Sequence, residues 1–192
     1  MKDFLIVGPF NAAAYKGVFP LVKAGKVRLG ASGRVQTFVT PEGDLRKFGN
    51  TIWFTTLTHG HANPPLTLTA TYSPEKCPRY GNFDAIEVGK TGDIPRDYYG
   101  VMGVPLTFIE RWNPGQFEIV GVIESWSELR TKRYGMVELV HPDGRRERCD
   151  PLDSGAAIEV PAPPEGKCYY VHGGRFYIQP YTRLLIRRKK LE

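Results

Sequence analysis

The sequence has 192 residues, of which 41% are hydrophobic and 24% are charged. This composition is ordinary for a globular protein and excludes a disordered, fibrous or coiled-coil chain. No apolar stretch approaches the roughly 18 to 20 residues that a transmembrane helix needs, so we expect no membrane partner. The 21 glycines, 16 prolines and 12% aromatic residues favour many short strands joined by tight turns.

Charge and cysteine content indicate the partner and the compartment. The net charge is +6, and residues 167–192 contain seven Lys and Arg residues beside one acidic residue, whereas the rest of the chain is balanced. Such a basic segment suggests an anionic partner such as nucleic acid, and a solvated basic surface is the alternative. The cysteines Cys77, Cys149 and Cys168 are few and far apart, which is typical of reduced thiols. With no signal-peptide core at the start, we expect a cytoplasmic location.

The first thirty residues predict a βαβ-like unit. Residues 3–7 form a short, mostly apolar run closed by Gly8-Pro9, the pattern of a strand buried on both faces. A helical apolar stripe follows, with Asn11 as a plausible N-cap, Gly17 and Pro20 as breaks and Gly25 as its end; its residues are Tyr15, Val18, Phe19 and Val22. Residues 27–30 are a second strand candidate.

The first strand poses a physical problem. A strand buried on both faces belongs inside a parallel sheet, where neighbours pair with both of its edges. This one starts at residue 3. Either downstream strands flank it, or the chain is the second half of a larger sheet.

From Val35 onward the apolar residues alternate with a period of two, which predicts a mostly antiparallel remainder. The predicted strands span 35–39, 51–57, 66–71, 83–88, 104–109, 117–123 and 135–140, followed by a hairpin at 171–176 that closes on 183–187. Turns are predicted at 41–44 and 141–144. The expected fold is α+β and β-rich. Residues 1–60 would form the sheet that begins with the βαβ-like unit, and residues 61–192 a β-rich region.

Isolated motifs carry little chemistry. Asn63-Pro64-Pro65-Leu66 is similar to the Asn-Pro-Pro-aromatic tetrapeptide of amino-group methyltransferases, but Leu66 cannot stack on a flipped base, so we interpret it as a chance match. Gly89-Lys90-Thr91 lacks the earlier glycine of a P-loop, and no Gly-x-Gly turn occurs. His59 and His61 have no accompanying ligand cluster, so no metal site is predicted.

Basic residues interleaved with aromatic residues are candidates for contact with nucleic acid, since cations track phosphates and rings stack on bases. The candidates are Lys132, Arg133, Arg145, Arg146, Arg183, Arg187 and Arg188.

A set of ordered segments is far more specific than any single motif. They are Phe4–Gly8, Asn11–Ala12, Tyr15–Lys16, Phe19–Lys23, Leu29–Gly30, Trp53–Leu57, Tyr80–Val88, Asp93–Pro95, Gly100–Phe108, Asn113–Ile119 and Arg183–Lys189. Read in order, they resemble the C-terminal portion of the EcoRI-type adenine-specific DNA methyltransferase family. The resemblance covers most of the chain.

The resemblance implies transfer of a methyl group from S-adenosylmethionine to the exocyclic amine of adenine in duplex DNA, within restriction-modification. It also implies that residues 1–60 are the end of a Rossmann-like methyltransferase sheet. The family's main cofactor-binding segment and its Asn-Pro-Pro-Phe tetrapeptide precede the strand that is here Phe4–Val7, so no catalytic residue is expected in this chain. We therefore expect the chain to be inactive alone and to need an N-terminal methyltransferase half.

By the same resemblance, Trp53, Phe54 and Thr55 lie on a late strand that lines the target-base pocket, where an aromatic ring could offset the unstacking of a flipped adenine. Packing of an ordinary strand is the alternative. Asn11, Tyr15 and Lys16 follow the first strand, at the edge where open α/β sheets bind ligands. Asn11 could instead be only a helix cap.

Two other hypotheses stay open at this point. The chain could be a stand-alone DNA-binding module that has kept a recognition surface and lost catalysis, or a non-catalytic remnant. The recognised DNA sequence and the oligomeric state are not encoded in any pattern found here.

Overall fold

Two compact units make up the chain, residues 1–64 with 110–112 and residues 65–109 with 113–192, and each is described by itself. The computed structural model describes residues 2–58 and 63–190, without the side chains of residues 31–36 and Phe48. His59 and His61 therefore lie outside the described residues.

The first unit contains three strands and two short helices, β1 (Leu5–Pro9), the 3-10 helix η1 (Phe10–Ala14), α1 (Phe19–Lys23), β2 (Arg28–Val39) and β3 (Leu45–Thr55). The predicted helix is split as expected around Gly17, because α1 begins with Pro20 in its first turn. Asn11 is not an N-cap, since Pro9 precedes η1 and makes no side-chain cap bond. The two strands predicted at 27–30 and 35–39 are one continuous strand, β2.

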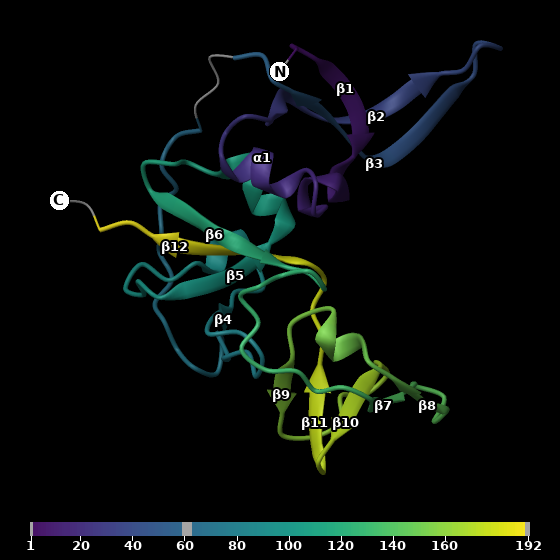
Figure 1. Ribbon diagram of the computed structural model, residues 1–192, viewed down its shortest axis with the longest axis vertical. Coiled ribbons are helices and arrows are strands. Elements are labelled where there is room, and N and C mark those ends of the chain that lie inside the picture. Colours follow the sequence, from purple (N-terminus) through teal and green to yellow (C-terminus); the bar gives the residue numbers. More distant parts are fainter. Residues whose placement is uncertain (1, 59–62, 191–192) are drawn as a thin grey trace. The chain divides into compact units, whose positions relative to one another are not determined.

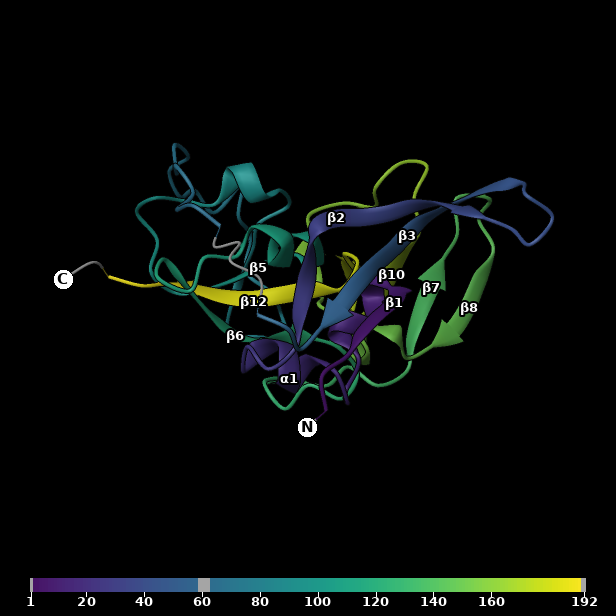
Figure 2. The same cartoon turned by 90° about the horizontal axis from the view of Figure 1, so that it is seen from above.

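The sheet of this unit has the order β1-β3-β2, visible in Figure 2, and β3 is antiparallel to both neighbours. β1 and β2 therefore run parallel to each other but are not adjacent, so the predicted βαβ-like unit is split by β3. The reason is the turn at Pro41–Asp44, predicted correctly, which returns the chain directly after β2. Gly43 has φ +90 in this turn, and the Thr40 N–H donates to the Asp44 carbonyl at 2.8 Å.

The prediction that the first strand is buried on both faces is wrong for the described residues. Leu5 is 56% exposed and Ile6 is 55% exposed, although adjacent strand residues point to opposite faces. One edge of β1 pairs with β3, from Leu5 opposite Thr55 to Pro9 opposite Thr51. The other edge pairs with no described strand. The described residues therefore leave both faces of β1 exposed at these two positions, as well as one of its hydrogen-bonding edges.

The second unit contains a four-stranded sheet with β12 at its centre (Figure 1). Its order is β4 (Ile86–Glu87), β5 (Val101–Pro105), β12 (Arg183–Arg188) and β6 (Phe117–Ile123). β4 and β5 are parallel, and the other pairs are antiparallel. Leu184, Leu185 and Ile186 on β12 are all buried, as expected for a central strand with both faces covered.

A five-stranded antiparallel sheet follows in the same unit. Its order is β8 (Arg146–Cys149), β7 (Val137–Val140), β10 (Tyr169–His172), β11 (Arg175–Ile178) and β9 (Ile158–Val160). The predicted hairpin at 171–176 is confirmed, with positive φ at Gly173 and Gly174 in its turn. It does not close on 183–187, because that segment is β12 and pairs with β5 and β6.

Three further predicted strands differ from the structure. Residues 66–71 form no ladder, because the Gln116 side-chain amide bonds both the N–H and the carbonyl of Leu66, each at 2.7 Å. Residues 83–88 contain only the two-residue β4. The segment 104–109 leaves β5 for the 3-10 helix η3 (Leu106–Arg111). The 3-10 helices η2 (Thr91–Asp93) and η4 (Pro151–Asp153) complete the unit.

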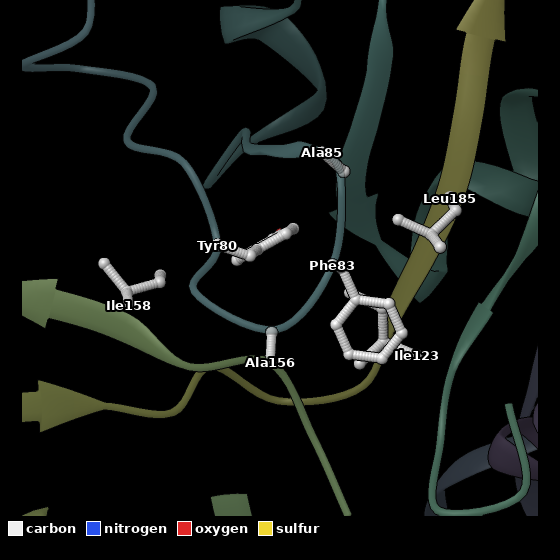
Figure 3. Packing of buried hydrophobic residues seen from close by; sticks show 7 residues of the cluster. All are labelled: Tyr80, Phe83, Ala85, Ile123, Ala156, Ile158 and Leu185. Atoms are coloured by element: carbon white, nitrogen blue, oxygen red, sulfur yellow. The ribbon is translucent and has the colours of Figure 1, made fainter. Parts of the chain in front are cut away.

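The second unit has its own hydrophobic core. Figure 3 shows seven buried residues that come from both of its sheets and from the segment before β4: Tyr80, Phe83, Ala85, Ile123, Ala156, Ile158 and Leu185. Buried Asn82 ties the segments together, since its Nδ2 donates to the carbonyls of Leu152 and Gly155 at 2.9 Å and its Oδ1 accepts from the Ala157 N–H at 2.8 Å. These bonds satisfy a buried amide that would otherwise be costly.

The fold is thus β-rich, with few short helices and mostly antiparallel sheets, as predicted. Among the described residues, none of the helices has the length and apolar character needed to cross a membrane.

Candidate functional site

The predicted target-base residues lie on β3, the central strand of the first unit. Ile52 and Phe54 are buried and share one face of the strand, whereas Trp53 points to the other face and is half-buried. Trp53 lies opposite Val7 of β1. A Cβ at Gly30 of β2 would come within 2.7 Å of the Trp53 Cβ, so the indole needs glycine beside it.

Buried Thr55 uses its hydroxyl to hold the backbone. The Oγ1 atom donates to the Phe4 carbonyl at 2.8 Å and accepts from the Leu57 N–H at 3.0 Å. Both bonds close the end of the β1–β3 pair. Of the three predicted pocket residues, Trp53 is therefore the one whose side chain is partly accessible.

Asn11, Tyr15 and Lys16 follow the carboxyl end of β1, as predicted, and all three are exposed. Tyr15 also ends η1, where its N–H donates to the Ala12 carbonyl at 3.0 Å. The end of β1 that leads to them pairs with Thr51, two residues from Trp53 along β3. The two predicted groups therefore belong to the same unit, with Trp53 on β3 and the other group in and after η1, outside the sheet.

The four basic residues between 132 and 146 are exposed and lie at or near the five-stranded sheet. The Lys132 Nζ lies 4.4 Å from the centre of the Tyr134 ring. Arg146 pairs with Glu138 at 3.0 Å across β7 and β8. Arg133 and Arg145 are also solvent-accessible. Ion pairs at the surface are weak, so they leave these cations accessible to an anionic partner.

Arg183 forms a mostly buried ion pair with Glu87. Its guanidinium donates from Nε at 3.0 Å and from Nη2 at 2.8 Å to Glu87 Oε1, and the two side chains are only 12% and 10% exposed. The Tyr80 hydroxyl donates to the other carboxylate oxygen of Glu87. Burial, followed by the charge of Glu87, raises the pKa of Tyr80. The sequence predicted Arg183 as a DNA contact, and its placement favours holding β12 to β4.

The end of β12 carries a basic and aromatic surface that the sequence prediction identified only in part. Arg188 lies 5.0 Å from the centre of the exposed Tyr99 ring, and the Lys190 Nζ lies 6.0 Å from it. We call Tyr99, Arg188 and Lys190 the Tyr99 patch. Arg187 is beside it in sequence and pairs with Glu118 at 3.5 Å. A signal for Tyr99 was present in the Tyr98-Tyr99 pair, but only the fold shows that it meets the basic end of β12.

In the Asn63-Pro64-Pro65-Leu66 segment, the Asn63 side chain forms hydrogen bonds to backbone carbonyl groups. The Asn63 Nδ2 donates to the carbonyls of Glu110 and Trp112 at 3.1 Å and 3.0 Å. This placement agrees with the interpretation of a chance match. Among the described residues, no group of three or more His, Cys, Asp and Glu side chains is arranged to hold a metal ion.

Comparison with known proteins decides the family. The family profile described as "Adenine-specific methyltransferase EcoRI" matches residues 1–189. The chain belongs to this family. The predicted resemblance is confirmed, and it extends over nearly the whole sequence.

Three curated relatives define the extent of the match. The Type II methyltransferase M.EcoRI of Escherichia coli is 40% identical over 139 residues, which cover 62% of this chain and 42% of the relative. The Type II methyltransferases M.MgeORF184P of Mycoplasma genitalium and M.MpnI of Mycoplasma pneumoniae are each 33% identical, covering 62% of this chain and 44% of each relative. The chain thus spans less than half the length of these relatives. No solved structure matches it.

The Arg183–Glu87 pair yields a stability prediction. Arg183→Met leaves a buried carboxylate without its cation and should lower the free energy of unfolding by about 3 to 5 kcal/mol. Arg187→Met, on the same strand, removes a pair whose side chains are 49% and 51% exposed, and it should cost less than about 1 kcal/mol. Denaturant unfolding measures both. The double variant Glu87→Gln/Arg183→Met should regain part of the loss, and equal effects of the two single variants would contradict a structural role for Arg183.

Proposed function

We propose that this chain is the C-terminal portion of an N6-adenine DNA methyltransferase of a restriction-modification system. In this proposal, residues 1–60 complete a Rossmann-like methyltransferase sheet and residues 61–192 recognise duplex DNA. The chain has no methyltransferase activity by itself. It works with a segment that carries the cofactor-binding strands and the Asn-Pro-Pro-aromatic tetrapeptide, either in one longer polypeptide or as a separate chain.

The observation that carries the proposal is the composition of β1. Leu5 and Ile6 expose apolar side chains on opposite faces, and the edge away from β3 pairs with no described strand. Proteins usually protect a natural edge strand with charged side chains, proline, bulges or a covering segment. Pro9 ends β1, but residues 5–7 contain no charged side chain and no proline. Their composition fits a strand that has a neighbour on each edge and a layer on each face.

The strand order supports the Rossmann-like assignment. β1 and β2 run parallel, α1 lies between them in sequence, and antiparallel β3 is inserted between them in space. Parallel strands joined through a helix are the elements of α/β sheets. Additional parallel strands on the open side of β1 would continue such a sheet.

The described residues do not fit S-adenosylmethionine on their own. Cofactor sites of this fold use a glycine turn whose backbone N–H groups approach the ligand between a strand and a helix. Here β1 passes into η1 through Pro9 with φ -64, and none of the described glycines with positive φ lies at this junction. The exposed Asn11, Tyr15 and Lys16 can contribute only one side of a cofactor or substrate site. We therefore assign no cofactor-dependent step to this chain.

The role proposed for this chain is contact with the substrate. Trp53 offers a half-buried indole, and its packing on a flipped adenine would recover part of the unstacking cost of a few kcal/mol. Lys132, Arg133, Arg145 and Arg146, with Arg187 and the Tyr99 patch, would contact phosphates or unstacked bases. Free thiols at all three cysteines fit a cytoplasmic setting for this activity.

A stand-alone DNA-binding module is the second candidate function. It is favoured by the second unit, which has its own hydrophobic core and a buried Asn82 network independent of the first unit. Such a unit can hold its basic surface in place without a complete methyltransferase sheet.

Reconstitution tests the proposed function. We expect the purified chain to show no binding of S-adenosylmethionine by calorimetry and no transfer of labelled methyl groups to duplex DNA. Methylation should appear when the chain is co-expressed with a family segment that contains the cofactor-binding strands and Asn-Pro-Pro-aromatic. Tight cofactor binding by the chain alone would contradict the proposal. DNA binding without any gain of methylation would favour the stand-alone module.

The apolar edge of β1 yields a second prediction. Leu5→Lys/Ile6→Lys should change the stability of the chain alone by less than about 0.5 kcal/mol, because both side chains are exposed. It should prevent reconstitution, because charges would be buried in the completed sheet. Val39→Lys/Leu45→Lys is a matched control, since these residues are 69% and 72% exposed and pair with each other in the β2–β3 hairpin. Equal activity of both double variants would show that β1 is a natural edge.

DNA binding yields a third prediction. Arg187→Glu/Arg188→Glu should weaken binding to a duplex and reduce the steepness of its logarithmic salt dependence by about two, since each phosphate contact contributes about one. Arg79→Glu/Arg175→Glu makes the same change in net charge at two exposed, ion-paired arginines elsewhere in the second unit. Fluorescence anisotropy at several salt concentrations distinguishes the pairs. The same loss in both would mean that only net charge matters.

A further inference from the structure

Three side chains in or next to the five-stranded sheet contact one another in series, and none of the three is among the predicted DNA contacts. The Cys168 Sγ lies 3.7 Å from the His141 Nδ1, and the His141 Nε2 lies 2.8 Å from the Glu147 Oε1. Cys168 is exposed to solvent. A nucleophile (Cys168), a base (His141) and an acid (Glu147) therefore contact one another in that order.

The strand register explains why these residues meet. Tyr169, the first residue of β10, pairs with Val140, the last residue of β7. Because the strands are antiparallel, Cys168 just before β10 lies beside His141 just after β7. The Leu139–Glu147 pair between β7 and β8 puts Glu147 on the same face as His141, two positions along β7. The turn that begins at His141 is fixed by the His141 N–H, which donates to the Arg145 carbonyl at 2.9 Å. The cluster therefore rests on paired strands.

The hydrogen-bond contacts of His141 indicate which of its ring nitrogens carries the proton. Glu147 is an acceptor when ionised, so the hydrogen-bond network assigns the imidazole proton to Nε2 and leaves the Nδ1 lone pair facing Cys168. A nucleophile within reach of a base that a third group orients is the general arrangement of activated side-chain nucleophiles. The charged groups that face the imidazole are Glu147 and Arg145, whose Nη2 lies 3.4 Å from both ring nitrogens.

The other two cysteines offer internal comparisons. Cys77 is buried and Cys149 is half-buried, and burial is the main cause that raises the pKa of each thiol. Among the described residues, no imidazole lies at hydrogen-bond distance from either thiol, unlike that of Cys168. Metal binding does not explain the cluster, because Cys168 and Glu147 contact different nitrogens of the same imidazole. Among the described residues, no group of side chains is arranged to hold a metal ion.

We propose that Cys168 is a histidine-activated thiol and a site of reversible modification by small disulfides such as oxidised glutathione. The Cys168 S–H proton passes to His141 Nδ1, and the thiolate attacks one sulfur of the disulfide. A new S–S bond forms to Cys168, the original S–S bond breaks, and the departing thiolate takes the proton from His141. The protein thiol is oxidised to a mixed disulfide, and one half of the reagent is reduced to a thiol, so no other oxidant is needed.

The test measures mixed-disulfide formation at each cysteine of the whole chain. The protein is incubated at pH 7 with excess oxidised glutathione, quenched with acid and analysed by peptide mass spectrometry. Cys168 should react fastest of the three cysteines. His141→Asn should slow its reaction by about fivefold, since thiolate fraction and nucleophilicity partly compensate. Glu147→Gln should slow it in the same direction.

Glu159→Gln is the matched control, because Glu159 is an exposed, ion-paired carboxylate of the same sheet that bonds Arg175 at 3.1 Å and does not take part in the cluster. It should leave the rate unchanged. Circular dichroism checks each variant, and if His141→Asn fails to fold, Glu147→Gln decides. A Cys168 rate that equals that of Cys149, or that is the same in the wild type and in Glu147→Gln, would overturn the proposal.

Discussion

The hydrogen-bonding edges of a β-strand must be paired, solvated or covered, and the open edge of β1 is the constraint on which the functional account depends. β3 satisfies one edge of β1. The other edge, with Leu5 and Ile6 exposed on opposite faces, has the composition of an interior strand in a surface position. The chain spans less than half the length of the curated relatives it matches, and in the proposed function a further segment of such a protein supplies the neighbours of β1. The open edge of the β1-β3-β2 sheet is therefore the structural observation on which the proposed activity rests.

The second unit is built differently, because the buried side chains of Asn82 and Glu87 find their partners within the unit. Asn82 holds three backbone groups of the segment 152–157, and Arg183 neutralises the buried Glu87. Arg130 reinforces the same segment by donating to the Gly155 carbonyl at 3.1 Å, and its burial lowers its pKa. Arg183 and Arg188, both on β12, therefore differ in role, since Arg183 pairs with buried Glu87 while Arg188 lies beside the exposed Tyr99 ring. The result is a rigid support for an exposed basic surface.

Local patterns predicted turns and several strands, including β6, whose partner β12 is distant in sequence, and they failed where a distant side chain took the backbone hydrogen bonds. β6 was predicted at its observed bounds, and the turns at Gly43 and Gly144 follow from residues that tolerate positive φ. The strand expected at Leu66 was lost to the Gln116 side chain, fifty residues away, which periodicity cannot reveal. The βαβ-like unit was misjudged because adjacency in space depends on where β3 inserts. For the candidate site, residue types indicated basic and aromatic contacts, but only the fold shows that Arg183 pairs with buried Glu87 and that Tyr99 lies beside Arg188.

The most direct test of the central claim is hydrogen–deuterium exchange at the backbone amides of β1. In the chain alone, the amides of residues 5–8 that point away from β3 should exchange at nearly the rate of an unstructured peptide, because the open edge leaves them in water. Addition of the family segment that restores methylation should protect them strongly, while the amides of the β7–β8 hairpin stay unchanged. Protection of this edge already in the isolated chain, or restored methylation without any new protection of β1, would contradict the account.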